Sequence, residues 1–240
     1  MNPVLDLSER LSVLPIIYGS GDFAIEVRRR LLSMRPDCVA VALPASFADA
    51  VESGVERLPV ISAVVQREIT LESEYNYVPI DPCQGIIAAV RTAMDMEVDR
   101  AFIDLEVELY EEQELVLPDP YALKEVAFEK FLAALLPALP PPLMGEQRQE
   151  RIRRMAYELH RLELEYERVA FVCSVADWPW VRQAYAERAP YIDHQRTGTL
   201  PECRRVAADC LYFALGELPY ITHLYEYRRA EMVADASLAV

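Results

Sequence analysis

Short apolar runs alternate with longer amphipathic segments along most of the chain. Runs rich in β-branched and aromatic residues, with the length of strands, occupy residues 14–18, 38–43, 60–65, 75–80, 101–105 and 169–173. Apolar residues recur at helical spacing in residues 23–34, 46–56, 84–96, 121–136, 146–165, 178–187, 201–215 and 220–233. Pro36, Pro44 and Pro82 lie at the junctions, where chain breakers are expected. This alternation predicts an α/β fold with a central, mostly parallel sheet and helices on both faces.

A long helical segment separates the last predicted strand from the others. Residues about 119–166 form this insertion, which we expect to lie as a lobe beside the sheet. The proline-rich run 137–142 within it is too short for a flexible domain linker and is typical of a stiff spacer. We therefore predict one α/β domain over residues 1–240. The last ten residues carry no helix cap or breaker, so the chain is expected to end in a fraying helix or to continue into a longer protein.

Charge and cysteine content exclude some classes of function. The chain has 24 Lys and Arg against 39 Asp and Glu, a net charge of −15, which disfavours general nucleic-acid binding. No uninterrupted apolar run reaches the length of a membrane span, and residues 1–10 do not resemble a signal peptide. The five cysteines form no Cys-x-x-Cys pair and are interpreted as reduced thiols. These features predict a cytoplasmic protein without membrane contact.

Two similar turns mark the candidate ligand site. Residues 16–22 and 169–177 each run from an apolar strand through small residues to an aspartate, and a helical pattern follows. Open α/β sheets bind ligands at such strand-to-helix turns, which makes Ser20, Asp22 and Asp177 candidates. We expect the two strands to be parallel neighbours, with both aspartates at one edge. A helix N-cap, worth about 1 kcal/mol, is the alternative role for each aspartate.

Two further residues are candidates for the same site. Asp104 ends a predicted strand, and Glu106 and Glu108 would share its side if that strand continued. Arg151 belongs to the one concentrated basic patch, with Arg148, Arg153 and Arg154, and could bind an anion or a carboxylate. The alternative for this patch is pairing of the kind Arg154–Glu158 on an exposed helix. The sequence contains no Gly-x-Gly-x-x-Gly turn, P-loop or Gly-x-Ser-x-Gly nucleophile elbow.

Several segments, in order, resemble a known superfamily. Residues 16–44 read as strand, Gly-Ser-Gly-Asp turn, helix and then Arg-Pro-Asp-Cys-Val-Ala-Val-Ala; residues 151–156 read Arg-Ile-Arg-Arg-Met-Ala. This resembles the TraB/Tiki, ChaN and erythromycin-esterase-like superfamily, which has a Gly-Thr-x-His turn, an Arg-Pro-Asp-Val-Val-x-Val-Glu strand and an Arg-Asp-x-x-Met-Ala helix. Residues 167–173 are similar to its last core strand, which normally runs into Gly-x-x-His. Residues 77–82, 98–104 and 215–220 are similar to a bacterial branch of unknown function.

The resemblance also identifies what this chain lacks. The superfamily's two histidines fall at Asp22 and Asp177, and its strand glutamate falls at Ala42. Those residue types would serve a hydrolase as metal ligands or bases, and Ala42 supplies neither. We therefore expect a pseudoenzyme that keeps the scaffold, uses no cofactor and acts as a binding or scaffold module in a bacterial assembly. Its candidate pocket contains Ser20, Asp22, Asp104, Arg151 and Asp177.

An enzyme with an altered site is the alternative. In that hypothesis Asp22, Asp104 and Asp177 bind a divalent metal such as Mn²⁺ or Zn²⁺, with Asp22 and Asp177 as the main ligands, because carboxylates bind hard cations. The reaction would be hydrolysis of a small ester or peptide.

The C-terminal helix suggests a partner. Tyr220, Leu224 and Tyr227 align on one face, and Ile221 and Tyr225 extend the apolar surface beyond the stripe that a helix on a globular domain needs. This predicts contact with a partner protein or self-association through the aromatic C-terminal helix.

Overall fold

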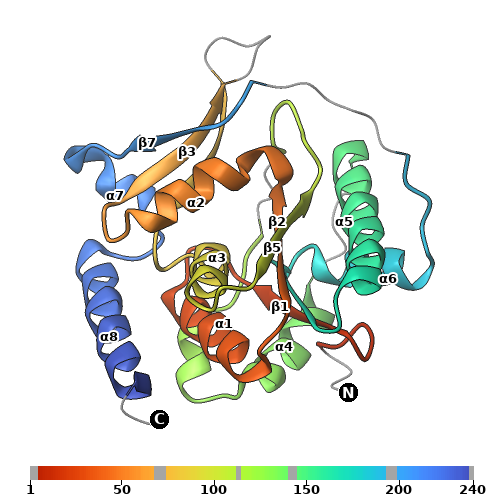
Figure 1. The fold of residues 1–240 in the computed structure, drawn as a ribbon, viewed down its shortest axis with the longest axis horizontal. Coiled ribbons are helices and arrows are strands. Elements are labelled where there is room, and N and C mark those ends of the chain that lie inside the picture. Colours follow the sequence, from red (N-terminus) through yellow and green to blue (C-terminus); the bar gives the residue numbers. More distant parts are fainter. Residues whose placement is uncertain (1–4, 68–73, 112–114, 140–144, 193–198, 238–240) are drawn as a thin grey trace.

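The main sheet is parallel and four-stranded. The computed structural model describes residues 5–67, 74–111, 115–139, 145–192 and 199–237. Within them, β1 (Leu11–Ile16), β6 (Val169–Ser174), β2 (Cys38–Pro44) and β5 (Asp99–Asp104) form one sheet in the order β1-β6-β2-β5 (Figure 1). All neighbours are parallel, with Leu11 opposite Val169 and Cys38 opposite both Val169 and Asp99. The predicted fold class is confirmed, and so is the pairing of the first and last predicted strands.

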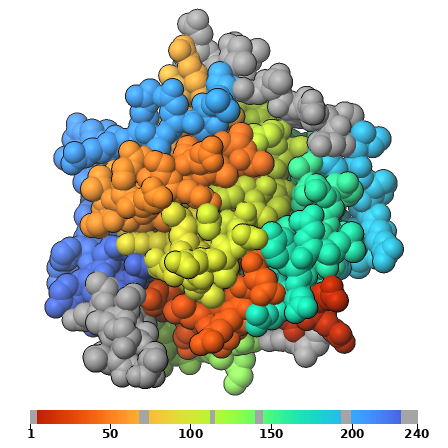
Figure 2. Space-filling view, in the orientation of Figure 1, coloured from red at the N-terminus to blue at the C-terminus, as the bar shows by residue number. Residues whose placement is uncertain are grey.

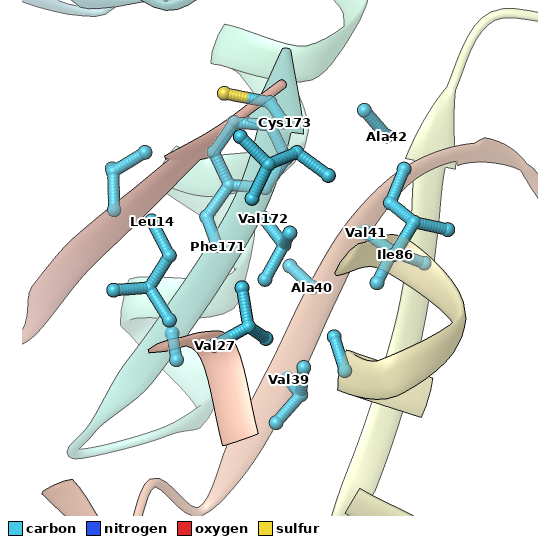
Figure 3. Packing of buried hydrophobic residues seen from close by; sticks show 14 of the residues in the cluster. Leu14, Val27, Val39, Ala40, Val41, Ala42, Ile86, Phe171, Val172 and Cys173 are labelled. Atoms are coloured by element: carbon cyan, nitrogen blue, oxygen red, sulfur yellow. The ribbon is translucent and has the colours of Figure 1, made fainter. Parts of the chain in front are cut away.

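The core is built on the two central strands. Val39, Ala40 and Val41 of β2 and residues 170–172 of β6 are fully buried. Figure 3 shows Val27 of α1 (Gly21–Met34) and Ile86 of α3 (Gly85–Asp95) packed against these two strands. Both strands are almost continuously apolar because a parallel sheet is covered on both faces.

Helices cover both sides of the main sheet. Figure 1 shows α1 (Gly21–Met34) and α3 (Gly85–Asp95) on one side, and α5 (Glu146–Glu165) and α6 (Trp178–Ala186) on the other. Helix α4 (Phe128–Leu135) packs on α1, where the rings of Phe128 and Phe131 meet the Phe23 ring edge-on at 5.8 and 6.0 Å. Short 3-10 turns occur at Ala45–Phe47, Pro120–Lys124, Leu136–Ala138 and Ala208–Cys210. Thus the residues of the predicted insertion lie directly against the sheet and α1.

A second, antiparallel sheet was not predicted. It contains β4 (Tyr75–Ile80), β3 (Ser62–Arg67) and β7 (Glu202–Arg205), in the order β4-β3-β7. Helix α2 (Ala48–Glu56) covers it so closely that a Cβ on Gly54 would lie 2.8 Å from Cγ1 of Ile80. Figure 2 shows α2, α3 and α1 as neighbouring bands across one face of the molecule.

The predicted helix 201–215 is wrong. This segment forms β7, a 3-10 turn and the one-turn helix α7 (Leu211–Ala214). Most residues of β7 are exposed, so the strand has no alternation of apolar and polar residues from which it could be predicted. The strand forms because it pairs with β3, where Cys203 lies opposite Val64, a contact between residues distant in sequence.

The C-terminal helix α8 (Pro219–Ser237) lies at the periphery (Figure 1). Its Glu226 pairs with Arg91 of α3 at 2.5 Å, and its Arg229 pairs with Asp95. Across the described residues, no helix is both long and apolar enough to cross a bilayer. Parts of two predicted segments, residues 140–142 of the proline-rich run and residues 238–240, lie outside the described residues.

Candidate functional site

A cavity of about 970 Å³ opens at the carboxyl ends of β2, β5 and β6. Its other walls come from β4, the loop after β5, and the first turns of α3 and α5. Ala42 at the end of β2, where the resemblance puts a glutamate, lines this cavity. The carboxyl edge of a parallel sheet is where α/β folds bind ligands. We call this cavity the sheet-edge pocket.

Two aspartates and two arginines form the polar floor of the pocket. Arg151 binds Asp104 through two nitrogens, with Nη2 at 2.6 Å from Oδ2 and Nε at 3.1 Å from both carboxylate oxygens. Arg148 donates to Oδ1 of Asp177 from Nη2 at 2.9 Å and from Nε at 3.1 Å. Arg151 Nη2 also lies 3.6 Å from Oδ2 of Asp177, which links the two pairs. All four side chains are buried, and we call them the floor tetrad.

Local structure explains how the tetrad is assembled. Asp104 is the last residue of β5, and Asp177 precedes the first residue of α6. Arg148 and Arg151 are three residues apart on α5, so both project from one face of that helix. Asp177 occupies the N-cap position of α6, but its side chain makes no cap hydrogen bond and is directed to the arginines. The expected cap role of Asp177 is therefore wrong.

The ion pairs control the charge states on the floor. Burial alone would lower the pKa of Arg151, but Asp104, Tyr110 and Asp177 outweigh it and raise that pKa well above the usual value. Burial raises the pKa of Asp104, whereas the Arg151 charge and its hydrogen bonds act against that increase. Arg151 is therefore always positively charged, and its charge and hydrogen bonds stabilise the buried Asp104 carboxylate.

Two tyrosine hydroxyl groups lie close to the tetrad. The Arg151 guanidinium lies 4.7 Å from the centre of the Tyr110 ring, and its Nη1 donates to the Tyr110 hydroxyl at 3.4 Å. Burial raises the pKa of Tyr110, with Asp177 and Asp104 adding to the effect. Desolvation of its hydroxyl, together with Tyr110 and Asp177, raises the pKa of Tyr18 well above its usual value. Both phenols are therefore neutral hydrogen-bond donors at physiological pH.

The loop after β5 covers one side of the pocket. Asn76 of β4 donates from Nδ2 to the Glu108 carbonyl at 2.8 Å and accepts from the Tyr110 N–H at 2.8 Å. Gln147 of α5 donates to the Leu109 carbonyl at 2.8 Å and accepts from the Glu111 N–H at 3.0 Å. Side chains from two elements thus hold the loop in place.

The strand before this loop does not continue past Asp104. Glu106 instead binds the N–H and hydroxyl of Ser46, both at 2.8 Å, so it does not join Asp104 on one strand face. The alignment of Asp104, Glu106 and Glu108 was expected only if the strand continued, and the backbone leaves the sheet after Asp104.

Ser20 and Asp22 are not part of the pocket lining. Ser20 is the N-cap of α1, where its Oγ accepts from the Phe23 N–H at 3.4 Å. Asp22 lies in the first helical turn, 3.9 Å from Nζ of Lys124, and burial raises its pKa. The expected N-cap role of Asp22 therefore belongs to Ser20.

The C-terminal segment covers the β1–α1 turn. Glu217 Oε1 accepts from the Gly21 N–H at 3.1 Å, and the Gly216 N–H donates to Asp81 at 2.8 Å. Backbone contact there is so close that a Cβ on Gly216 would lie 2.4 Å from Cα of Gly19. The C-terminal segment therefore packs directly on the turn that carries Ser20, whose preceding residues Ile17 and Tyr18 line the sheet-edge pocket.

The structure thus unites three of the five predicted site residues: Asp104, Arg151 and Asp177. Sequence reasoning missed Arg148, Tyr18 and Tyr110 as site residues. The spacing of Arg148, one helical turn before Arg151, was the available signal. Among the residues that the structure describes, no group of three or more His, Cys, Asp or Glu side chains is arranged to hold a metal ion.

Comparison with known proteins gave no match: no family model, no curated protein and no solved structure is significantly similar to this chain.

Proposed function

We propose that this chain is a non-hydrolytic binding module and that the sheet-edge pocket holds its small-molecule ligand. The observation that carries the proposal is the pairing of the two floor carboxylates. Arg151 binds both oxygens of Asp104, and Arg148 binds Oδ1 of Asp177, whose Oδ2 lies 3.6 Å from Arg151. Pairing with these cations disfavours both carboxylates as general bases or metal ligands. The pocket has the size and the mixture of apolar walls with a few convergent polar groups that is typical of ligand sites.

The metal-dependent hydrolase is the weaker candidate. It requires Asp22, Asp104 and Asp177 to converge, whereas Asp22 lies beside Lys124 and outside the pocket lining. From the sequence alone, we also propose that the chain is related to the TraB/Tiki, ChaN and erythromycin-esterase-like superfamily and that it is cytoplasmic.

Fragment binding and turnover test this function together. Ligand-observed NMR with a fragment library should identify binders of the wild-type protein that Val107→Trp loses, because Val107 lines the pocket and an indole at this position obstructs part of it. Val116→Trp is the matched control, since Val116 is fully exposed and outside the lining. No hydrolysis of small esters or peptides is expected with Mn²⁺, Co²⁺ or Zn²⁺. Metal-dependent turnover that a folded Asp22→Ala or Asp177→Ala variant loses would contradict the proposal.

The surface of α8 supports a further proposal, contact with another protein chain. Tyr220 and Tyr227 of α8 are 68% and 61% exposed, and Leu224 of the same helix and Phe213 of the preceding α7 add further exposed apolar surface. Clusters of exposed aromatic side chains are typical of protein interfaces. Sedimentation velocity tests the self-associated form, which Tyr220→Ser with Tyr227→Ser should weaken. A monomer at every concentration would contradict self-association.

A further inference from the structure

The charges that line the sheet-edge pocket do not balance. Among the residues that the structure describes, five charged ones line it, and four of them are the floor tetrad, in which two aspartates and two arginines cancel. Glu111 is the fifth. Because both guanidinium groups are engaged by aspartates, the described part of the lining offers an anionic ligand no cation that lacks a carboxylate partner.

Glu111 presents its carboxylate at the rim of the pocket. It belongs to the loop after β5, where its N–H is held by Gln147. Its Oε2 would lie 3.1 Å from a Cβ on Gly145, so the glycine before α5 leaves room for this carboxylate. No ion pair of Glu111 occurs with any residue in the described part of the chain.

Aromatic side chains line the same space. Tyr18, Tyr75, Tyr77 and Phe47 contribute to the pocket wall, together with Tyr110, whose ring already contacts the Arg151 guanidinium. Tyr75 and Tyr77 lie on β4, an edge strand of the small sheet, and Tyr77 is 60% exposed. The faces of aromatic rings attract cations, most strongly where the ring and the cation are shielded from water. The carboxylate at the rim and the aromatic rings of this pocket both favour a positively charged ligand.

We propose that the ligand of the sheet-edge pocket is an organic cation, an amine or ammonium group on an apolar or aromatic body. This inference rests on the proposed binding function and specifies its ligand class. The apolar body contacts the tyrosine wall, and the ammonium group lies at the rim near Glu111. The net charge of −15 draws cations to the protein and repels anions at low salt.

Three probes with one shape and different charges test this inference. Phenylbutylamine is a cation at neutral pH, phenylbutanol is neutral and phenylbutyrate is an anion. By isothermal titration calorimetry, we expect the amine to bind about tenfold more tightly than the alcohol, and the acid to bind most weakly. The preference should decrease with added salt, because salt screens charges at the rim.

Variants then locate the preference. Glu111→Gln removes the charge and keeps the shape, so amine affinity should fall about threefold to tenfold, while alcohol affinity is unchanged. Glu108→Gln is the control on the same loop, outside the pocket lining, and should leave all three affinities unchanged. Val107→Trp should abolish binding of the amine.

The outcomes separate this inference from the proposed function. Equal binding of amine and alcohol, tighter binding of the acid, or an unchanged amine affinity in Glu111→Gln overturns the cation inference. If Val107→Trp still abolishes binding of the probes in any of these cases, the proposal of a binding module is retained. A lack of binding by all three probes at millimolar concentration overturns both.

Discussion

Removal of the Arg151 guanidinium should destabilise the protein more than removal of any nearby surface arginine. The Arg151→Met variant keeps most of the apolar stem but leaves the buried Asp104 carboxylate without the group that binds both its oxygens. Breaking a buried ion pair from one side costs about 3–5 kcal/mol, because the remaining charge stays desolvated. We expect the free energy of unfolding, measured by urea denaturation, to fall by about that amount.

The matched control is Arg154→Met on the same helix. Arg154 pairs with Glu158 at 2.9 Å in an i,i+4 arrangement, and its side chain is 20% exposed. Pairs of this kind contribute about 0.3–0.5 kcal/mol, so the control should lose less than about 1 kcal/mol. Glu158 is buried as Asp104 is, but it keeps Arg161 as a second partner at 3.2 Å, so removal of Arg154 leaves no buried carboxylate without a cation.

The double variant Asp104→Leu with Arg151→Met separates the ion pair from packing. Replacing both partners by apolar side chains is often neutral, so the double variant should be more stable than the sum of the single losses predicts. In Arg151→Met alone, the pKa of Asp104, already raised by burial, loses its main opposing influence. A carboxyl with a raised pKa binds its proton more tightly in the folded state, so this variant should regain stability as the pH falls from neutral. Equal losses in Arg151→Met and Arg154→Met, or additive losses in the double variant, would refute the reasoning.

Two further predictions concern the C-terminal segment. Gly216→Ala should detach this segment at a cost of about 1–3 kcal/mol, because the new Cβ would meet the Gly19 backbone, and hydrogen exchange in α8 should become faster. The control is Gly145→Ala, whose Cβ meets only the Glu111 side chain and which should change exchange little. Equal exchange in both variants would contradict the prediction. Burial, with Cys83 and Glu226, raises the pKa of Tyr225 to about 12, so the stability from burying its neutral phenol should persist below pH 10 and be lost as the pH approaches 12. Circular dichroism should show a smaller alkaline loss in Tyr225→Phe than in the wild type, because Tyr18 and Tyr110 keep their own raised pKa values in the variant, and an equal loss in both would exclude Tyr225 as a cause.

Most of the fold was predictable because the main sheet is built from locally encoded elements. A strand covered on both faces must be apolar throughout, as β2 and β6 are, and a helix on the sheet needs one apolar stripe. The small sheet lacks such a signal in β7, a four-residue strand with mostly exposed side chains. Its pairing with β3 joins residues about 140 positions apart, which no local pattern encodes.

The site was predictable only where strand ends determine it. Asp104 is the last residue of β5 and Asp177 follows β6, and the carboxyl ends of both strands lie at one edge of the sheet, so topology brings the two aspartates together. The same reasoning selected Ser20 and Asp22, but their positions at a helix start are also what capping and the first turn require. Sequence position alone does not distinguish a ligand-binding residue from a helix-capping residue, because both are small polar or acidic residues that come after a strand.

The arginines explain why charge at the site could not be predicted from the aspartates alone. Arg151 and Asp104 are 47 residues apart, and Arg148 and Asp177 are 29 apart, so their contacts depend on how α5 packs beside β5. A carboxylate at the edge of a sheet is a base or a metal ligand when solvent is its only partner, and a structural anion when a guanidinium binds both its oxygens. The helix that brings the arginines therefore changes the chemistry of the pocket without changing a residue on the strands. Among the described residues, the same packing leaves Glu111 as the one lining charge outside the tetrad, so the proposed ligand class depends on the position of α5.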